Sequence, residues 1–289
     1  MTLEDLPPLR DVITSHELGA KKAFGQHFLL DLNLTAKIAR LAGDMSQDQA
    51  IEVGPGPGGL TRAILSEGAA SLLAVEKDGR FLDALSEINS ASGGRLTVEQ
   101  ADALDVNEAS LLTGPGDKVI LSNLPYNVGT QLLIKWLQAE PIWWRRAVLM
   151  FQREVADRVV ARPGDKAYGR LAVIAQSRCS AHLALKIPAR AFTPPPKVES
   201  AVVVLDPLPE AQQFKDVIAL ERITASAFGQ RRKTLRRSLA QAAGQASTSA
   251  DALLETAGID PGARAEVIDI AGFQTLATAW RSAYQTDRS

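Results

Sequence analysis

The chain has 289 residues, of which 46% are hydrophobic, and a formal net charge of −1. This length and composition are typical of a globular protein with one large domain, or with a large and a small one. The near-zero charge excludes a globally basic protein, so a nucleic-acid surface would require local segregation of charge.

The N-terminal stretch MTLEDLPPLRDV is acidic and has no apolar h-region, so it does not resemble a secretory signal. No apolar run approaches the ~20 residues that a membrane-spanning helix needs. The chain has a single cysteine, Cys179, which excludes an internal disulfide. These features together predict a cytoplasmic protein with no membrane partner.

Strand-like apolar runs alternate with amphipathic segments over roughly the first half of the chain. The predicted strands are Ala50–Val53, Leu72–Val75, Leu96–Glu99, Lys118–Leu121 and Ala147–Phe151. The predicted helices between them are 59–67, 79–89 and 129–138. This alternation predicts an α/β, Rossmann-like fold, with a mostly parallel sheet and helices on both faces.

The second half of the chain has a different pattern. Ser200–Leu205 is a further predicted strand, and 179–187 is a candidate partner for it. Two prolines within 206–209 indicate a boundary. Beyond it the patterns are only helical, at 211–227, 231–243, 249–257 and 273–285. We therefore predict an α/β domain over residues 1–206 and a smaller all-helical domain over residues 207–289.

A glycine-rich loop follows the first predicted strand and opens a helix: Glu52-Val53-Gly54-Pro55-Gly56-Pro57-Gly58-Gly59. Glycines allow sharp turns and close approach to a ligand, and the helix start presents free N–H groups. Gly54, Gly56 and Gly59 match the G-x-G-x-x-G dinucleotide pattern. Glu76, at the end of the next strand, is spaced to bind ribose hydroxyls. An NAD-dependent oxidoreductase is therefore one hypothesis.

Two carboxylates favour S-adenosylmethionine instead. Glu52 gives the pattern Glu-x-Gly-x-Gly-x-Gly, which resembles the loop of class I methyltransferases. Its charge can hold the loop and the cationic end of that cofactor, whereas a pyrophosphate would gain nothing from it. Asp102, after the third predicted strand, can accept a hydrogen bond from an adenine amino group. A helix N-cap is the alternative role for Asp102.

The tetrapeptide Asn123-Leu124-Pro125-Tyr126 follows the fourth predicted strand, where parallel sheets place functional residues. Amide and carbonyl oxygens can accept the N–H bonds of a planar amine while the aromatic ring stacks on its base. The alternative is a turn that merely closes a strand. Combined with the glycine loop, the tetrapeptide favours methyl transfer to an amine over hydride transfer.

Five motifs in this order resemble those of the ribosomal RNA adenine N6-dimethyltransferases. They are Lys21–Asp31, Glu52–Gly59, Asn123–Asn127, Phe151–Ala156 and Phe192–Ser200. The later run Ala227–Leu235 is similar to the housekeeping, KsgA-type branch that acts on the small subunit. The resemblance extends from about residue 20 to the C-terminus.

The resemblance implies a methyltransferase domain over residues 1–206 and a helical RNA-recognition domain over residues 207–289. It implies methyl transfer from S-adenosylmethionine to the N6 amines of two adjacent adenosines near the 3′ end of small-subunit rRNA, during ribosome biogenesis. The implied partner is this rRNA within the immature 30S subunit, and the protein is expected to be a monomer. The implied cofactor-binding residues are Gln26, His27, Leu29, Glu52, Gly54, Gly56, Glu76, Lys77, Asp102, Ala103 and Asn123.

The implied catalytic residues are Asn123, Leu124, Pro125, Tyr126 and Phe192. The Asn123 side-chain oxygen and a carbonyl of Leu124 or Pro125 would accept the two N–H bonds of the target amine. The motif contains no His, Lys or carboxylate to act as a base, so catalysis is expected to rest on positioning. Tyr126 would stack on the base. Phe192 would cover its other face, or else serve as a core aromatic that anchors a proline-rich loop.

A cluster of basic residues lies in segment 221–237, which has six basic residues and one acidic residue. The basic residues are Arg222, Arg231, Arg232, Lys233, Arg236 and Arg237, and Lys21 with Lys22 forms a smaller pair. We predict that a helix from about residue 231 presents these groups to RNA phosphates. The alternative is a solvated helix face.

Two further functions remain open from the residues alone. One is a large-subunit rRNA adenine methyltransferase, which shares the glycine loop and the Asn-x-Pro-Tyr turn but not the basic motif. The other is a ribosome-assembly binding factor in which methylation is secondary. No metal site is expected, because His16, His27 and His182 are scattered and Cys179 is single.

Overall fold

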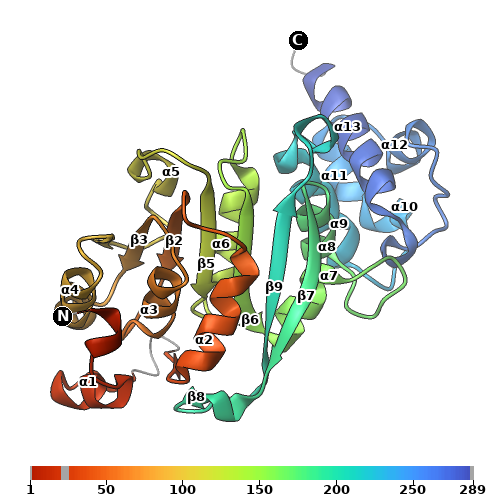
Figure 1. Cartoon of the computed structure of the whole chain (residues 1–289). Helices are drawn as coiled ribbons and strands as arrows, with labels where there is room; N and C mark the ends of the chain where they lie inside the picture. The colour runs from red at the N-terminus through yellow and green to blue at the C-terminus, as the bar shows by residue number, and fades with distance from the viewer. Residues whose placement is uncertain (1, 21–25, 287–289) are drawn as a thin grey trace. The chain divides into compact units, whose positions relative to one another are not determined.

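The computed structural model describes residues 2–20 and 26–286 (Figure 1). The chain forms two compact units. The first contains Met1–Lys135, Trp143–Ala156 and His182–Asp206, and the second contains Trp136–Ile142, Asp157–Ala181 and Pro207–Ser289. The chain passes between the units at the predicted boundary after residue 206. Because two earlier segments also belong to the second unit, the division is not a single cut in the sequence.

A seven-stranded sheet organises the first unit (Figure 1). Its strands are β2 (Gln49–Val53), β3 (Ser71–Glu76), β4 (Leu96–Gln100), β5 (Lys118–Asn123), β6 (Arg146–Gln152), β7 (Cys179–Ile187) and β9 (Ser200–Pro207). Their order is β4-β3-β2-β5-β6-β9-β7. Strands β4, β3, β2, β5 and β6 are parallel, and β9 runs antiparallel to β6. The predicted mostly parallel α/β fold is confirmed.

The burial of the strands explains their sequences. Nearly every residue of β2, β3, β5 and β6 is buried, as expected of strands covered on both faces, and their sequences are continuous apolar runs. The outermost strand β4 instead exposes Thr97, Glu99 and Gln100. Polar residues of this kind protect an edge strand from pairing with another chain.

A second, two-stranded sheet joins two distant motifs. Strand β1 (Phe28–Leu29) pairs antiparallel with β8 (Phe192–Thr193), with Leu29 opposite Phe192. Each strand has only two residues, which is too short for an alternating pattern to be visible in the sequence. The pairing brings the N-terminal motif against the proline-rich motif that lies over 160 positions later.

Helices of the first unit follow the expected alternation with strands. They are α1 (Leu9–Ser15), α2 (Leu32–Ala39), α3 (Gly59–Ser66), α4 (Leu82–Ala91), α5 (Glu108–Leu111), α6 (Gly129–Gln138) and α7 (Arg153–Val160), the last two continuing into the second unit. Short 3-10 turns are η1 (Leu3–Asp5), η3 (Arg40–Ala42), η4 (Gly79–Phe81) and η5 (Ala189–Ala191). Helix α3 is buried from Gly59 through Leu65 and packs on α2. A helix that is buried on all sides in this way belongs to the core.

The second unit is helical, as predicted. It contains α8 (Arg170–Gln176), η6 (Glu210–Gln212), α9 (Val217–Gly229), α10 (Leu235–Ser238), α11 (Ala240–Gln245), α12 (Ala250–Thr256), η7 (Ala265–Val267) and α13 (Ile270–Thr286). An aromatic cluster lies in its own core, where the Phe228 ring centroid is 5.8 Å from that of Tyr168 and 5.3 Å from that of Phe273. The buried Trp280 indole donates to the Ala242 carbonyl at 2.7 Å.

Two predicted helices of this unit are wrong in their bounds. The segment 211–227 is divided between η6 and α9, which begins at Val217. The segment 231–243 is not one helix, because 230–233 form a turn and the helical residues are divided between α10 and α11. The Leu235 amide donates outside the helix to the Ala263 carbonyl, and Thr234 forms an isolated β-bridge with Arg264. These long-range backbone bonds replace the local i to i−4 bonds that a continuous helix would make.

Candidate active site

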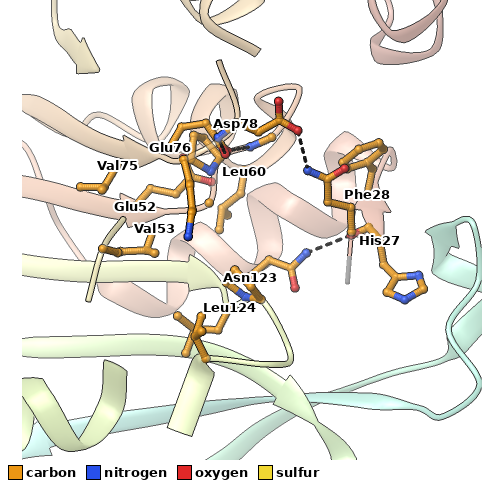
Figure 2. A pocket seen from close by; sticks show the side chains of 18 of the residues that line it. His27, Phe28, Glu52, Val53, Leu60, Val75, Glu76, Asp78, Asn123 and Leu124 are labelled. Atoms are coloured by element: carbon orange, nitrogen blue, oxygen red, sulfur yellow. Dashed lines mark hydrogen bonds between the residues drawn. The ribbon is translucent and has the colours of Figure 1, made fainter. Parts of the chain in front are cut away.

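One pocket lies where strands β2, β3 and β5 end (Figure 2). Strand β2 lies between β3, which follows it in the chain, and β5, which the chain reaches only after β4 at the edge, so the strand order reverses beside β2. Crevices at such a position are the usual ligand sites of open α/β sheets. All the predicted cofactor residues line this pocket, and so do Asn123, Leu124, Pro125 and Tyr126.

The glycine loop approaches two other segments closely. Gly54 has a φ of +71°, and a Cβ there would lie 3.4 Å from the Pro125 ring. A Cβ on Gly59 would lie only 2.5 Å from the Leu29 carbonyl oxygen. Gly54 therefore supplies the positive φ of the loop beside the Asn123–Tyr126 turn, and Gly59 allows the close approach to strand β1 that a side chain would prevent.

Glu76 presents its carboxylate to the pocket from the end of β3. It is 6% exposed, accepts the Gly56 amide at 3.1 Å on one oxygen and the Asp78 amide at 2.8 Å on the other. Burial raises the pKa of Glu76, and the two amide donors oppose that rise. Each oxygen retains a lone pair, so this carboxylate is fitted to accept hydrogen bonds from ligand hydroxyls.

Glu52 lies beneath the same loop and is only 1% exposed. Burial raises the pKa of Glu52 to about 8, while the Thr61 hydroxyl that donates to it at 2.6 Å lowers it and the charge of Glu76 raises it further. The ligand-free carboxyl is therefore mainly neutral at pH 7. A cation bound beside it would favour its ionised form.

Asp102 lies in the turn after β4. Its carboxylate pairs with the Lys77 ammonium at 2.7 Å and accepts the Leu104 amide at 3.0 Å. The hydrogen bond from Lys77, followed by the one from Leu104, lowers the pKa of Asp102, so the group is ionised. It closes a turn rather than capping α5, which begins six residues later at Glu108. The N-cap alternative is therefore not what the structure has.

The orientation of the Asn123 side chain is determined by one hydrogen bond. Its amide nitrogen donates to the His27 carbonyl at 3.2 Å, as the dashed line in Figure 2 shows. The reverse orientation would place two acceptors against each other, so the amide oxygen is the atom left for a ligand. The Pro125 carbonyl already accepts the Val128 and Gly129 amides. The Leu124 carbonyl has no donor within the part of the chain that the structure describes.

Tyr126 is held from two sides. Its hydroxyl is 2.8 Å from the Ser200 hydroxyl, and its ring centroid is 5.5 Å from that of His27. The His27 ring is itself fixed, because its Nδ1 donates to the Pro194 carbonyl at 2.7 Å. Burial raises the pKa of Tyr126 above its usual value near 10, so the phenol is neutral and cannot act as a base near pH 7.

The structure does not bring Phe192 to this pocket. Its side chain is 2% exposed and belongs to the hydrophobic core of the first unit. The pairing of Phe192 with Leu29 directs the ring inward, and the proline-rich loop follows directly. The role predicted for Phe192 in covering the base is corrected accordingly: it is a core aromatic that anchors this loop.

The predicted RNA-binding residues differ in their surroundings. Arg231 pairs with Glu266 and donates to the Tyr168 carbonyl, Arg236 pairs with Asp251, and Arg222 donates to Gln245. Arg232, Lys233 and Arg237 are exposed, and none of these three side chains has a hydrogen bond or ion pair within the described part of the second unit. Lys21 and Lys22 lie outside the described residues.

Several pocket residues were missed from the sequence. Phe28, Leu60 and Asp78 also line the pocket. Phe28 lies within the N-terminal motif, and Asp78 follows Glu76 by two positions at a strand end, so both had a signal that pointed to them. Leu60 is an ordinary helical leucine, and nothing in its sequence context distinguishes it from the core.

Among residues 2–20 and 26–286, no three His, Cys, Asp or Glu side chains lie together as a metal site would require. Over the same ranges, no helix combines the length and apolar character needed to cross a membrane.

The strand order and the pocket at the strand ends define a Rossmann-like fold of the methyltransferase class. In line with this, the chain matches a dimethyladenosine transferase from Plasmodium falciparum with a TM-score of 0.74, at 24% identity, over 89% of this chain and 98% of the other. The 23S rRNA methyltransferase ErmE matches with a TM-score of 0.62, at 25% identity, over 88% of this chain and 99% of the other.

The chain belongs to the ribosomal RNA adenine dimethylase family, whose model matches residues 18–280. It is 87% identical over 289 residues to a protein of Maricaulis maris named Ribosomal RNA small subunit methyltransferase A, covering 100% of both chains. These matches confirm the resemblance inferred from the five motifs. They leave the oxidoreductase hypothesis, which rested on the glycine pattern and the spacing of Glu76, without support.

Proposed function

We propose that this protein transfers methyl groups from S-adenosylmethionine to the N6 amines of two adjacent adenosines near the 3′ end of small-subunit rRNA. The observation that carries the proposal is the Asn123 amide, whose nitrogen is engaged by His27 and whose oxygen is left to accept from an amine. Membership of the adenine dimethylase family supports the reaction. The relative named for the small subunit, at 87% identity, supports the substrate.

The pocket fits the proposed cofactor by its chemistry. Glu76 offers acceptors for ribose hydroxyls, and Asp102 offers one for an adenine amino group. Gly54 and Gly56 leave open the space that a Cβ would fill, near Pro125 and Phe28 respectively. Glu52 lies where a cationic group would favour its ionised form. When bound, the cofactor supplies a methyl group on a sulfonium.

The residues of the turn would activate a poor nucleophile. The lone pair of an adenine amino group is delocalised into the ring. In the proposed complex, the Asn123 oxygen and the Leu124 carbonyl each accept one of its N–H bonds. We assign this role to the Leu124 carbonyl because the Pro125 carbonyl already accepts hydrogen bonds from two amides. This arrangement favours a more tetrahedral nitrogen whose lone pair is aimed at the methyl group.

Proton loss would follow methyl transfer rather than precede it. Tyr126 is neutral near pH 7 because burial raises its pKa. Its role would be to stack on the base, with its hydroxyl held by Ser200 and its ring beside His27. Stacking on an aromatic ring is worth about 1–3 kcal/mol per base. The target base must be unpaired or flipped to reach the turn.

The proposed partner is the rRNA of an immature 30S subunit. The exposed Arg232, Lys233 and Arg237 supply positive charge for its phosphates. Arg222, Arg231 and Arg236 remain in the proposed RNA surface, although each also has an intramolecular partner. The pair Lys21 and Lys22 is proposed from the sequence alone.

The proposal is tested by methylation of small subunits that lack the modification, using labelled cofactor and mapping the label. We expect label on two adjacent adenosines, and a loss of about a hundredfold or more in rate for Asn123→Ala, since removal of one preorganised polar group costs that much in other enzymes. Asn33→Ala, at the exposed start of α2, is the control and should retain normal activity.

Three results would contradict the proposal. Near-normal turnover by Asn123→Ala would eliminate the positioning mechanism. Label on large-subunit RNA offered in parallel, and not on small subunits, would favour the alternative substrate. Failure of the folded protein to bind S-adenosylmethionine would leave only a binding role in subunit assembly.

A further inference from the structure

Lys135 is a partly buried lysine of α6 that lies outside the pocket and contacts the segment beside it. Its ammonium donates to the Ala103 carbonyl at 2.6 Å and also to the Val106 carbonyl. It pairs with the carboxylate of Glu108 at 2.9 Å, and Glu108 is only 2% exposed. The Lys135 ammonium therefore links three residues of one short segment, Ala103, Val106 and Glu108, to helix α6.

The joined segment carries the adenine side of the proposed cofactor site. Asp102 and Ala103 line the pocket, and the Asp102 carbonyl accepts the Asp105 amide to close the turn. After Gln100, where β4 ends, the Ala101 amide still donates to the Glu76 carbonyl of β3, but the turn from Asp102 to Val106 has no further sheet pairing before α5 begins at Glu108. Apart from the turn bonds, its position depends on Lys77 at Asp102 and on Lys135 at the carbonyls.

Helix α6 connects this segment with the Asn123–Tyr126 turn. The helix starts at Gly129, whose amide donates to the Pro125 carbonyl. Lys135 lies on the same helix, six residues further on. The charge of Lys135 also acts on Asp102, where it favours the ionised carboxylate. Helix α6 thus contacts both sides of the pocket, at the Pro125 carbonyl through its first residue and at the Ala103 carbonyl through Lys135.

We propose that Lys135, with Glu108 as its counter-ion, is a positioning residue that holds the Asp102–Val106 turn in register for the adenine of the cofactor. The inference rests on the proposed use of S-adenosylmethionine. The three N–H donors of an ammonium match the three oxygens, whereas the planar fork of an arginine does not. Removal of the ammonium leaves two carbonyls and a buried carboxylate without this donor.

The chain contains a matched control in Lys118. Its ammonium also donates to two loop carbonyls, those of Gly114 at 2.9 Å and Gly116 at 2.6 Å. Like Lys135 it is partly buried, but its loop does not line the pocket. Lys135→Met and Lys118→Met each remove two bonds to loop carbonyls, at the adenine turn and away from it, and Lys135→Met also removes the ion pair with Glu108.

The experiment measures binding of S-adenosylhomocysteine and of its inosine counterpart, in which an oxygen replaces the amino group, together with methylation kinetics. Wild type should prefer the adenine ligand, because Asp102 accepts from its amino group. Lys135→Met should weaken the binding of S-adenosylhomocysteine about tenfold. It should also reduce the ratio of the affinities for S-adenosylhomocysteine and its inosine counterpart. The KM for the cofactor should rise while kcat at saturation stays within about twofold of wild type. Lys118→Met should lose less thermal stability, because no buried carboxylate loses its counter-ion there, and should show neither change in binding.

The outcomes separate this inference from the proposed function. If wild type binds neither ligand, the proposed cofactor use fails and this inference fails with it. If wild type binds as expected and Lys135→Met behaves like Lys118→Met, only the positioning role is overturned. If Lys135→Met does not fold, Glu108→Gln decides instead. It keeps an acceptor for the ammonium but removes the charge, and should weaken binding in the same direction by a smaller factor.

Discussion

At the scale of single residues, Glu52 shows how burial changes the chemistry of an ordinary carboxyl. The group has one hydroxyl donor, Thr61, and almost no contact with solvent. Its pKa is raised from 4.5 to about 8, so the folded protein holds a proton that the unfolded chain releases above about pH 4.5. Since the folded state then binds more protons, this group lowers stability as the pH rises from about 4.5 to 8.

Glu52→Gln should therefore remove part of the pH dependence of stability. Without ligand, the variant and wild type should unfold at similar temperatures near pH 5. The variant should become the more stable of the two towards pH 8, by up to about 1.4 kcal/mol per pH unit. Thermal unfolding from pH 5 to 9 measures this difference. Glu67→Gln, the same change at a carboxylate paired with Arg40, is the control. Parallel curves for Glu52→Gln and wild type would contradict the raised pKa.

At the scale of elements, the site depends on three short segments that meet at Gly59. This residue begins α3, ends the glycine loop and lies against the Leu29 carbonyl of β1. Strand β1 is held in turn by β8, and the His27 carbonyl just before it orients Asn123. A displacement at Gly59 is therefore expected to reach both the glycine loop and the Asn123 amide.

Gly59→Ala should be destabilising, because its Cβ would lie 2.5 Å from backbone that cannot move without shifting β1. We expect a loss of about 1–3 kcal/mol, as for other overpacked sites, together with weaker cofactor binding. Gly244→Ala in α11, where a Cβ would have no atom within 4 Å, should instead be neutral or gain up to about 1 kcal/mol. Equal thermal unfolding midpoints for the two variants would show that the close approach of Gly59 to the Leu29 carbonyl does not affect stability.

At the scale of the whole molecule, charge is distributed unevenly although the total is −1. Some basic side chains of segment 221–237 have an intramolecular partner. Others have none among the described residues. Arg231, paired with Glu266, and Arg236, paired with Asp251, contribute to the second unit itself. Arg232 and Lys233 lie in an exposed turn, where their charge is available to a polyanion.

Charge reversal at Arg232 and Lys233 should weaken RNA binding and reduce its dependence on salt, with a slope smaller by about 2 if each residue contacts one phosphate. Reversal of Lys37 and Arg40 in the first unit is the control, because both residues are exposed and the double variant changes the net charge equally. RNA affinity measured across a salt series compares the two. An equal loss of RNA affinity in both double variants would mean that RNA binding depends only on the net charge of the protein.

Much of the fold was predictable because its signals are local. The buried strands are continuous apolar runs, and the predicted helix 129–138 has the bounds of α6. The glycine loop, Glu76, Asp102 and the Asn123–Tyr126 turn were identifiable because each follows a strand. Parallel topology then places strand ends together without further information. The interrupted helix after residue 230 was not predictable, since its backbone bonds go to residues about 30 positions away.

The sequence by itself determined the fold class, the family and which side chains gather at the strand ends, since these depend on periodicity and on motifs that are local in the chain. Only the tertiary structure decided what those side chains do. It placed Phe192 in the core, oriented the Asn123 amide through the His27 carbonyl, and separated Arg232 and Lys233 from arginines that have partners. These outcomes depend on burial and on hydrogen bonds between residues far apart in sequence, which no local pattern encodes.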